Sequence, residues 1–221
     1  LFAQVVQNPT FPENDWNIIQ KTYVQDLNAR QEDPSQIARD VFNGLSYDWQ
    51  YRGRLNSIEQ IQAVDTKAMK DWYSSYLTPA NASIFVGGDI TLEEVQPLLE
   101  AHFGSWATEG KDLPPLPKTS ILPEAESTKV FLIDKAGASQ SVIYGGHFVT
   151  ERTNEQAEEL YLANLAVGGL FIARINMNLR EDKGWTYGAR SNVSYSHLPG
   201  LWKVSSSVVA EHTADSLSEI M

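Results

Sequence analysis

The 221-residue chain contains no cysteine. Disulfides and thiolate metal sites, including zinc held by cysteine, are therefore excluded. Basic residues are also scarce, because 17 Lys and Arg stand against 28 Asp and Glu and give a formal net charge of -11. Binding to phosphate backbones needs clustered Lys and Arg, so we expect no nucleic-acid partner.

Long apolar runs are missing as well. The longest candidates are interrupted by Gly, Asn or Asp and stay short of the roughly 18 to 20 residues that a spanning helix needs, so we expect no membrane span. The composition, 42% hydrophobic and 20% charged, is typical of a globular chain. The first residue is Leu1, and residues 218–221 continue a helical pattern. We therefore expect a piece of a longer protein, whose leader sequence is not shown.

Apolar residues at three- and four-residue steps predict helices in the first part of the chain. The longest begins after Phe11 and Pro12 and carries a stripe that we expect to be buried. This stripe consists of Trp16, Ile19, Tyr23, Val24 and Leu27. A helix before it ends at Asn8, ahead of Pro9, and the next one starts at Pro34.

Polar caps predict three further helices, and one strand lies among them. The helices start after Ser57, Asp65 and Thr91, whose side chains can accept hydrogen bonds from a first helical turn. Residues 82–86 are mostly apolar and are followed by a Gly-Gly-Asp turn, which predicts a short buried strand.

A proline-rich segment divides the chain. Four prolines among Lys, Ser and Glu predict an extended linker at residues 111–128. After it we expect strands at 129–133 and 141–149, a helix from about 153 to the glycine pair at 168–169, and a second helix at 170–182. Strands at 186–195 and 201–209 and a final helix from 213 follow. This mixture predicts an α+β fold.

The most informative stretch is residues 179–189, a charged helix end that passes through Gly184 into an aromatic-rich strand. It places Arg180 and Tyr187 seven residues apart. An arginine on a last helical turn and a tyrosine on the following strand can offer a cation and a phenolic hydrogen bond to one carbonyl group. The alternative is a surface arginine paired to Glu181 or Asp182, with the tyrosine on the core face.

Several short motifs occur in an order that resembles the pitrilysin, or insulinase-like, zinc metallopeptidases over almost the whole chain. Each motif is weak alone, but their order and spacing together are specific. They are residues 8–13, 76–81, 86–90, 140–141, 168–169, and 179–184 with 187–188.

The resemblance implies two homologous α+β domains that face each other across a cavity. Residues 1–110 would be the C-terminal part of the first domain, 111–128 the linker, and 129–221 the truncated N-terminal part of the second. Arg180 would hold a substrate backbone carbonyl, and Tyr187 would stabilise the oxyanion of the tetrahedral intermediate.

The zinc motif of that family, His-x-x-Glu-His, is absent from this sequence. The four histidines are far apart and none has a partner at helical spacing. They are His102, His147, His197 and His212. The family's third ligand, a glutamate, aligns with Asp15, which we interpret as a carboxylate at a helix N-terminus rather than a ligand.

Other local patterns have simpler explanations. His147 near Ser139 and Ser141 lacks the strained elbow of a serine nucleophile. Gly137 and the pair at 87–88 lack the lysine or glycine triplet of a phosphate loop and are interpreted as turns. Residues 49–52 include Trp49, Tyr51 and Arg52, which could contact a peptide but are expected to pack as a loop on the domain edge.

The resemblance therefore implies the inactive, non-zinc-binding portion of a peptide-cleaving metalloprotease, a hydrolase that is inactive as this chain alone. Its partners would be a peptide substrate and a zinc-binding domain, either in the same polypeptide or in a partner subunit. A catalytically dead peptide-binding or scaffold subunit with the same fold is the alternative. The family resemblance to exported bacterial peptidases predicts a periplasmic or secreted location.

Overall fold

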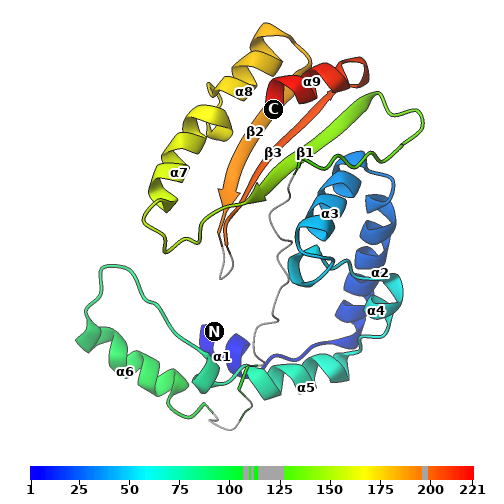
Figure 1. Cartoon of the computed structure of the whole chain (residues 1–221). Coiled ribbons are helices and arrows are strands. Elements are labelled where there is room, and N and C mark those ends of the chain that lie inside the picture. Colours follow the sequence, from blue (N-terminus) through cyan, green and yellow to red (C-terminus); the bar gives the residue numbers. More distant parts are fainter. Residues whose placement is uncertain (107–109, 111, 114–126, 196–198) are drawn as a thin grey trace. The chain divides into compact units, whose positions relative to one another are not determined.

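A computed structural model describes residues 1–106, 110, 112–113, 127–195 and 199–221. Internal packing divides the chain into two compact units (Figure 1). Unit 1 comprises Leu1–Leu27 and Asn56–Pro117, and unit 2 comprises Asn28–Leu55 and Lys118–Met221. The predicted linker lies mostly outside the described residues. The prediction that residues 1–110 and 129–221 belong to two homologous domains concerns their common descent. Internal packing does not test it, so it stays a prediction.

Unit 1 is helical in its described residues. Its elements are α1 (Phe2–Gln7), α2 (Glu13–Arg30, which ends in unit 2), α4 (Ile58–Gln62), α5 (Thr66–Tyr76), η2 (Pro79–Asn81) and α6 (Leu92–Phe103). The predicted caps are confirmed, because Ser57 and Thr91 each form a capping box and Asp65 accepts a hydrogen bond from the amide of Ala68.

Two predictions about unit 1 are wrong. Residues 82–86 form no strand, and Phe85 is 93% exposed. The stripe predicted along α2 is not buried, since Ile19 and Tyr23 are exposed and no residue of the helix is buried. Both patterns are those of buried elements, but the described residues of unit 1 supply neither a neighbouring strand nor an apolar surface to cover them.

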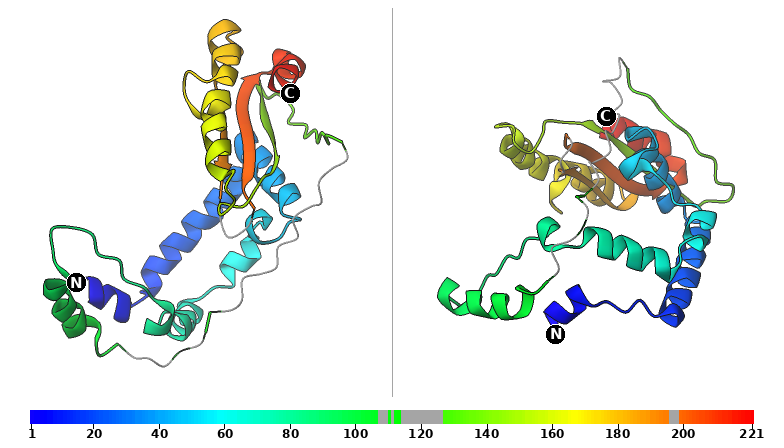
Figure 2. Two further views of the ribbon diagram at one scale, coloured as in Figure 1. Left: turned by 60° about the vertical axis from the view of Figure 1, so that its left-hand side comes forward. Right: turned by 90° about the horizontal axis from the view of Figure 1, so that it is seen from below.

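Unit 2 is built on a three-stranded antiparallel sheet with the order β1-β3-β2 (Figure 2). The strands are β1 (Gln140–Phe148), β2 (Thr186–Ser194) and β3 (Leu201–Val209). They confirm the strands predicted for these regions. The strand predicted at residues 129–133 is wrong, because this segment is not paired and its Leu132 is 91% exposed.

Helices accompany both faces of this sheet. They are α3 (Pro34–Ser46), η1 (Tyr51–Gly53), α7 (Ala157–Asn164), the π-helical turn η3 (Leu165–Gly169), α8 (Arg174–Asn176), the π-helical turn η4 (Met177–Asp182), η5 (Ala210–His212) and α9 (Thr213–Ile220). Pro34 stands in the first turn of α3, as predicted, with Asp33 as its cap.

Strand alternation separates the two faces. Val204 and Val208 of β3 are buried on the face where Asn164 of α7 bonds to the sheet, and Leu179 of η4 is fully buried. On the other face, the Phe42 ring of α3 lies 5.8 Å from the ring of Tyr144 on β1. This layered arrangement confirms the α+β class.

The helical segment Ala157–Asp182 corrects the expectation about apolar runs. It spans 26 residues, its most apolar window of 18 residues has a mean hydropathy of 1.4, and it is long and apolar enough to cross a membrane by length and composition. The same composition suits a helix that packs on a sheet, and this segment does so through buried Leu179 and through Asn164, which bonds to β2.

Candidate functional site

Arg180 lies in the π-helical turn η4, at the end of the helical segment. Its guanidinium carbon is 4.7 Å from the centre of the Phe171 ring, and its Nε is 3.2 Å from a carboxylate oxygen of Glu181. The side chain is 39% exposed. A π-turn redirects side chains relative to a regular helix and is frequent at functional sites. Arg180 is thus held on one side by an aromatic face while still reaching solvent.

A tight turn connects Arg180 to the strand that follows. Gly184 has φ of +65°, a conformation in which a residue without Cβ is favoured. Its amide donates to the carbonyl of Arg180 over 3.0 Å, and the amide of Trp185 donates to the carbonyl of Leu179 over 2.9 Å. These two bonds close the helix end around the glycine, each spanning one residue more than in a Schellman cap, and start β2 directly beside it.

Tyr187 follows at the beginning of β2, inside a β-bulge. Thr186 pairs with Val208 and Ala189 with Ser206, so β2 has one residue more than β3 between these two pairs. A bulge of this kind disrupts the ladder locally and redirects a side chain. Tyr187 is 89% exposed as a result. The alternative placement of this tyrosine on the core face is therefore wrong.

Hydroxyl groups stabilise the bulge. The Oγ1 of Thr186 lies 2.7 Å from the carbonyl oxygen of Ser207 and 3.1 Å from that of Gly188, and it accepts from the amide of Gly188 at 3.0 Å. The Oγ of Ser206 donates to the same region, 3.0 Å from Thr186 Oγ1. Backbone groups that the bulge removes from the ladder are thereby satisfied.

A buried asparagine joins the helix of Arg180 to the strand of Tyr187. Asn176 is 3% exposed, its Nδ2 donates to the carbonyl of Phe171 over 2.6 Å, and its Oδ1 accepts the amide of Ala189 at 3.1 Å. One side chain thus ties the segment that carries Phe171 to the strand immediately after the bulge. Asn176 was not predicted from the sequence, although a polar residue between apolar helical positions was a usable signal.

A second polar cluster fixes the end of η4 against α9. The Nζ of Lys183 lies 3.0 Å from Oε1 of Glu219, and Nδ2 of Asn178 donates to Oε2 of Glu219 over 2.7 Å. These hydrogen bonds, that from Lys183 first, hold the pKa of the Glu219 carboxyl below its ordinary value of 4.5. The carboxylate is therefore charged at neutral pH and anchors the turn that follows Arg180.

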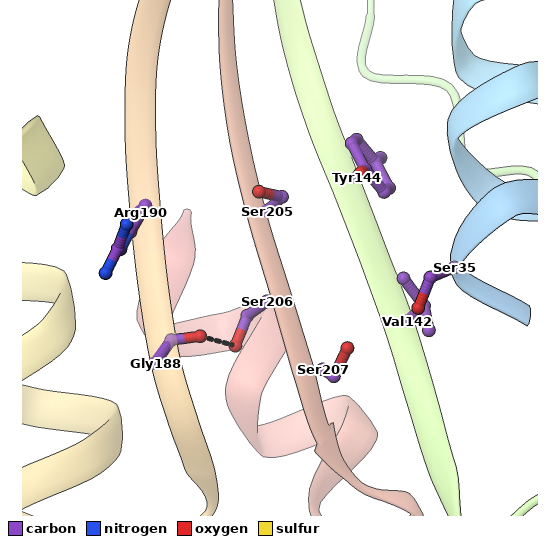
Figure 3. A pocket seen from close by; sticks show the side chains of 8 residues that line it. All are labelled: Ser35, Val142, Tyr144, Gly188, Arg190, Ser205, Ser206 and Ser207. Carbon is purple, nitrogen blue, oxygen red and sulfur yellow. Dashed lines mark hydrogen bonds between the residues drawn. The ribbon is translucent and has the colours of Figure 1, made fainter.

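A shallow depression of about 200 Å³ lies on the sheet face beside the bulge (Figure 3). Its lining is rich in hydroxyl groups and includes one cation. The residues are Ser35, Val142, Tyr144, Gly188, Arg190, Ser205, Ser206 and Ser207. In Figure 3, Ser205, Ser206 and Ser207 follow β3 between Tyr144 of β1 and Arg190 of β2. The depression thus places polar donors next to Gly188, the neighbour of Tyr187.

Within the described ranges, no three His, Asp or Glu side chains are grouped closely enough to hold a metal ion. His147 packs on Trp202 with 5.6 Å between ring centres, and His212 stacks on Trp185 at 4.6 Å. His197 lies outside the described residues. Asp15 stands in the first turn of α2, as interpreted from the sequence. The donor set of these residues does not fit a zinc site.

The serine nucleophile is equally unsupported by the geometry. Ser141 and His147 are six residues apart on one straight strand, a separation of about 20 Å at the strand rise of about 3.3 Å. The Oγ of Ser141 is instead 2.7 Å from Oγ1 of Thr213. In the loop after α3, the ring of Trp49 packs so closely on Gly44 that a Cβ there would lie 2.4 Å from it, which agrees with the expected edge packing.

Comparison with known proteins identifies the family. The model of the family described as "Peptidase M16 inactive domain" matches residues 63–221. An uncharacterized zinc protease of Mycobacterium leprae is 23% identical over 99% of this chain and 53% of its own length. One of Bacillus subtilis is 25% identical over 86% of this chain and 45% of its own length. The chain thus spans about half the length of these curated relatives.

Solved structures share the fold. The peptidase M16 inactive domain from Pseudomonas fluorescens superposes with a TM-score of 0.81 at 18% identity, covering 99% of this chain and 52% of that one. A protease from Helicobacter pylori gives 0.77 at 16% identity, covering 98% and 54%. The chain belongs to the family of peptidase M16 inactive domains, which confirms its resemblance to the pitrilysin-like zinc metallopeptidases.

Proposed function

We propose that this chain is the substrate-holding, non-zinc portion of a zinc metalloendopeptidase, to which it contributes Arg180 and Tyr187. The observation that carries the proposal is the bulge at the start of β2, which holds Tyr187 89% exposed directly after the turn that follows Arg180. Membership of the inactive-domain family and similarity to zinc proteases support it.

The two side chains have distinct roles in this proposal. The phenol of Tyr187 donates a hydrogen bond to the oxyanion that forms when water attacks a peptide carbonyl. The guanidinium of Arg180 has five N–H donors in a fixed fork and binds a backbone carbonyl of the peptide. Contact with Phe171 and Glu181 fixes the plane of that fork before substrate arrives.

Zinc belongs to the other part of this composite site. Because the described residues offer no suitable donor group, we assign no zinc ligand to this chain and expect the ligands and the general base in the remainder of the polypeptide or in a partner subunit. On this proposal the isolated chain hydrolyses no peptide, with or without added zinc. A periplasmic or secreted location remains part of the proposal.

Replacing Arg180 with alanine tests the proposal in the whole protein, read from its complete coding sequence. We expect kcat/KM for peptide hydrolysis to fall about 100-fold, since a charge-assisted contact to a backbone carbonyl of the peptide is lost. Zinc content and melting temperature should stay unchanged. Arg174→Ala is the matched control, because Arg174 is an exposed arginine of the same helical segment. Equal turnover in the two variants would reject the role of Arg180.

A peptide-binding scaffold is the second candidate. It is favoured by the ion pair between Arg180 and Glu181, which is the arrangement expected of a structural surface arginine. Peptide binding by the whole, zinc-loaded protein without any turnover would support the scaffold and exclude the composite active site.

A further inference from the structure

The face of the unit 2 sheet that bears the depression is covered at β1 and open at β2. On this face α3 packs on β1, where the rings of Phe42 and Tyr144 lie 5.8 Å apart. Farther across the sheet, Arg190 and Asn192 of β2 are exposed. Antiparallel sheets commonly leave part of one face to solvent, with polar side chains on it. This part of the face is therefore accessible to a ligand from solvent.

Two cations lie on the open part of this face. In the register of β2 and β3, Arg190 is opposite Ser205. Lys203 comes two residues before Ser205 and is opposite Asn192. Strand alternation places both cations on one face as diagonal neighbours about 7–8 Å apart, within reach of one ligand. Among the described residues neither cation forms an ion pair, although the chain has 28 Asp and Glu.

Hydroxyl groups of β3 border the same place. Ser205 and Ser207 line the depression together with Arg190 and lie on its face of the sheet. Figure 3 shows these serines along β3, whereas Ser206 between them donates to the carbonyl of Gly188 over 3.2 Å. A serine hydroxyl can donate one hydrogen bond, and arginine has five donors in a fixed fork. The depression thus offers hydrogen-bond donors and positive charge, which together suit a carboxylate.

The start of α3 already holds an acidic side chain. Ser35 of its first turn lines the depression, and the amide of Ser35 donates to the carboxylate of Asp33 over 2.8 Å. Asp33 is the cap of this helix, so its carboxylate takes the place at the helix N-terminus that an external anion would use. Binding of an anion therefore depends on the strand side, where Arg190 and Lys203 lie.

We propose that Arg190 and Lys203, with the hydroxyl groups of β3, bind the carboxylate of an Asp or Glu side chain in the peptide substrate. The inference rests on the proposed function, which places the reacting carbonyl at Tyr187. Arg190 is the third residue after Tyr187 on β2, a distance of about 10 Å at the strand rise of about 3.3 Å. An extended peptide then carries the acidic side chain about two to four residues from the scissile bond.

The overall charge of the chain limits this preference to one position of the peptide. A net charge of -11 repels acidic peptides as a whole and attracts basic ones. Arg190 and Lys203 reverse that sign locally, over the reach of two side chains. A peptide with one acidic residue at the matching position is therefore favoured, whereas carboxylates at its other positions are not.

A glutamate scan through a cleavable peptide tests the proposal on the whole, zinc-loaded protein. Each position carries in turn Glu and Gln, which have nearly the same shape and differ in charge. At one position, about two to four residues from the scissile bond, we expect kcat/KM to be about 10-fold higher for Glu, through a lower KM. Equal cleavage of both peptides at every position, or a preference spread evenly along the peptide, would overturn the proposal.

Variants of the two cations identify the residues that read the charge. Arg190→Gln should bring the Glu-to-Gln ratio at that position to about 1, and Lys203→Gln should lower it as well. Arg190→Glu should reverse the preference, so that a Lys peptide is cleaved better than the Glu peptide. Arg174→Gln is the matched control, because it removes an exposed arginine of the helical segment, and should keep the ratio. A wild-type ratio in folded Arg190 and Lys203 variants would overturn the proposal.

Two further readouts separate this inference from its alternatives. Inorganic phosphate, added alone, is the probe for a small free anion. Saturable phosphate binding that Arg190→Gln removes, without any preference for Glu peptides, would overturn the peptide site in favour of a free-anion site. The affinities of the scanned peptides for the whole protein give the same Glu-to-Gln ratio without turnover.

The outcome for this inference is distinguishable from that for the proposed function. If Arg180→Ala keeps full turnover while Arg190→Gln abolishes the preference for Glu, the proposed function fails and the carboxylate site stands. If Arg180→Ala loses turnover while Arg190→Gln keeps the preference, the proposed function stands and this inference is rejected.

Discussion

At the scale of single residues, the exposure of Tyr187 depends on a hydroxyl group next to it. Thr186 Oγ1 contacts the carbonyls of Gly188 and Ser207 and thereby stabilises the extra residue in β2. Without the bulge, regular strand alternation would resume along β2 and the direction of the tyrosine would change. Thr186 is thus a positioning residue in this account.

Thr186→Val should lower the free energy of unfolding by about 1–3 kcal/mol, because a backbone group of the bulge loses its partner at nearly constant side-chain volume. Turnover by the whole protein should fall as well, since Tyr187 is redirected. Thr186→Ser keeps the hydroxyl and should retain most of both. Denaturant unfolding and steady-state kinetics measure the two effects. Normal turnover in a destabilised Thr186→Val protein would show that the bulge does not position Tyr187.

The sequence predicted the spacing of Arg180 and Tyr187 but not their surroundings. The glycine between them indicated a turn, and Gly184 indeed has a positive φ. The bulge could not be predicted, because it depends on the register between β2 and β3, which the residue pattern of either strand alone does not determine. The tie through Asn176 likewise depends on which residues face each other across a helix and a strand.

At the scale of elements, the helical segment approaches the sheet closely at one glycine. A Cβ on Gly168 would lie 2.4 Å from Oγ and 2.6 Å from the amide nitrogen of Ser191 on β2. Asn164, one turn earlier, is buried and accepts hydrogen bonds from Ser191 Oγ at 2.6 Å and from Trp202 Nε1 at 2.9 Å. The π-turn η3 falls where this close packing requires the helix to deviate.

Gly168→Ala should therefore destabilise the chain by about 1–3 kcal/mol, since backbone atoms must shift to admit the methyl group. Gly87→Ala is the matched control, because a Cβ there has no atom within 4 Å. Thermal unfolding of the two variants checks the difference. A Gly168→Ala protein as stable as the control would mean that α7 and η3 do not pack on β2 at this distance.

Helices were predicted better than strands, for a physical reason. A helix satisfies its backbone within itself, and caps such as Ser57, Asp65 and Thr91 are local signals. A strand needs a neighbour, and the apolar patterns at 82–86 and 129–133 indicate strands without supplying one. The sequence thus indicated two strands for which the described part of the chain contains no pairing strand.

At the scale of the whole molecule, the chain offers an exposed tyrosine and a partly exposed arginine but no group of metal donors in its described part. It belongs to the peptidase M16 inactive domains and spans about half the length of its curated relatives. These facts support the proposal that another part of the protein binds zinc. In the sequence, the spacing of the four histidines gives no metal-binding pair on a helix.

The most direct test of the central claim is the turnover number of the whole, zinc-loaded protein carrying Tyr187→Phe. The substitution removes one hydroxyl from an 89% exposed ring, so folding and zinc content should not change. Loss of an oxyanion donor predicts a decrease in kcat of about 100- to 1,000-fold. Tyr161→Phe, on a 52% exposed tyrosine of α7, should have wild-type kcat. If Tyr187→Phe also turns over at the wild-type rate, Tyr187 is not part of the active site and the account is contradicted.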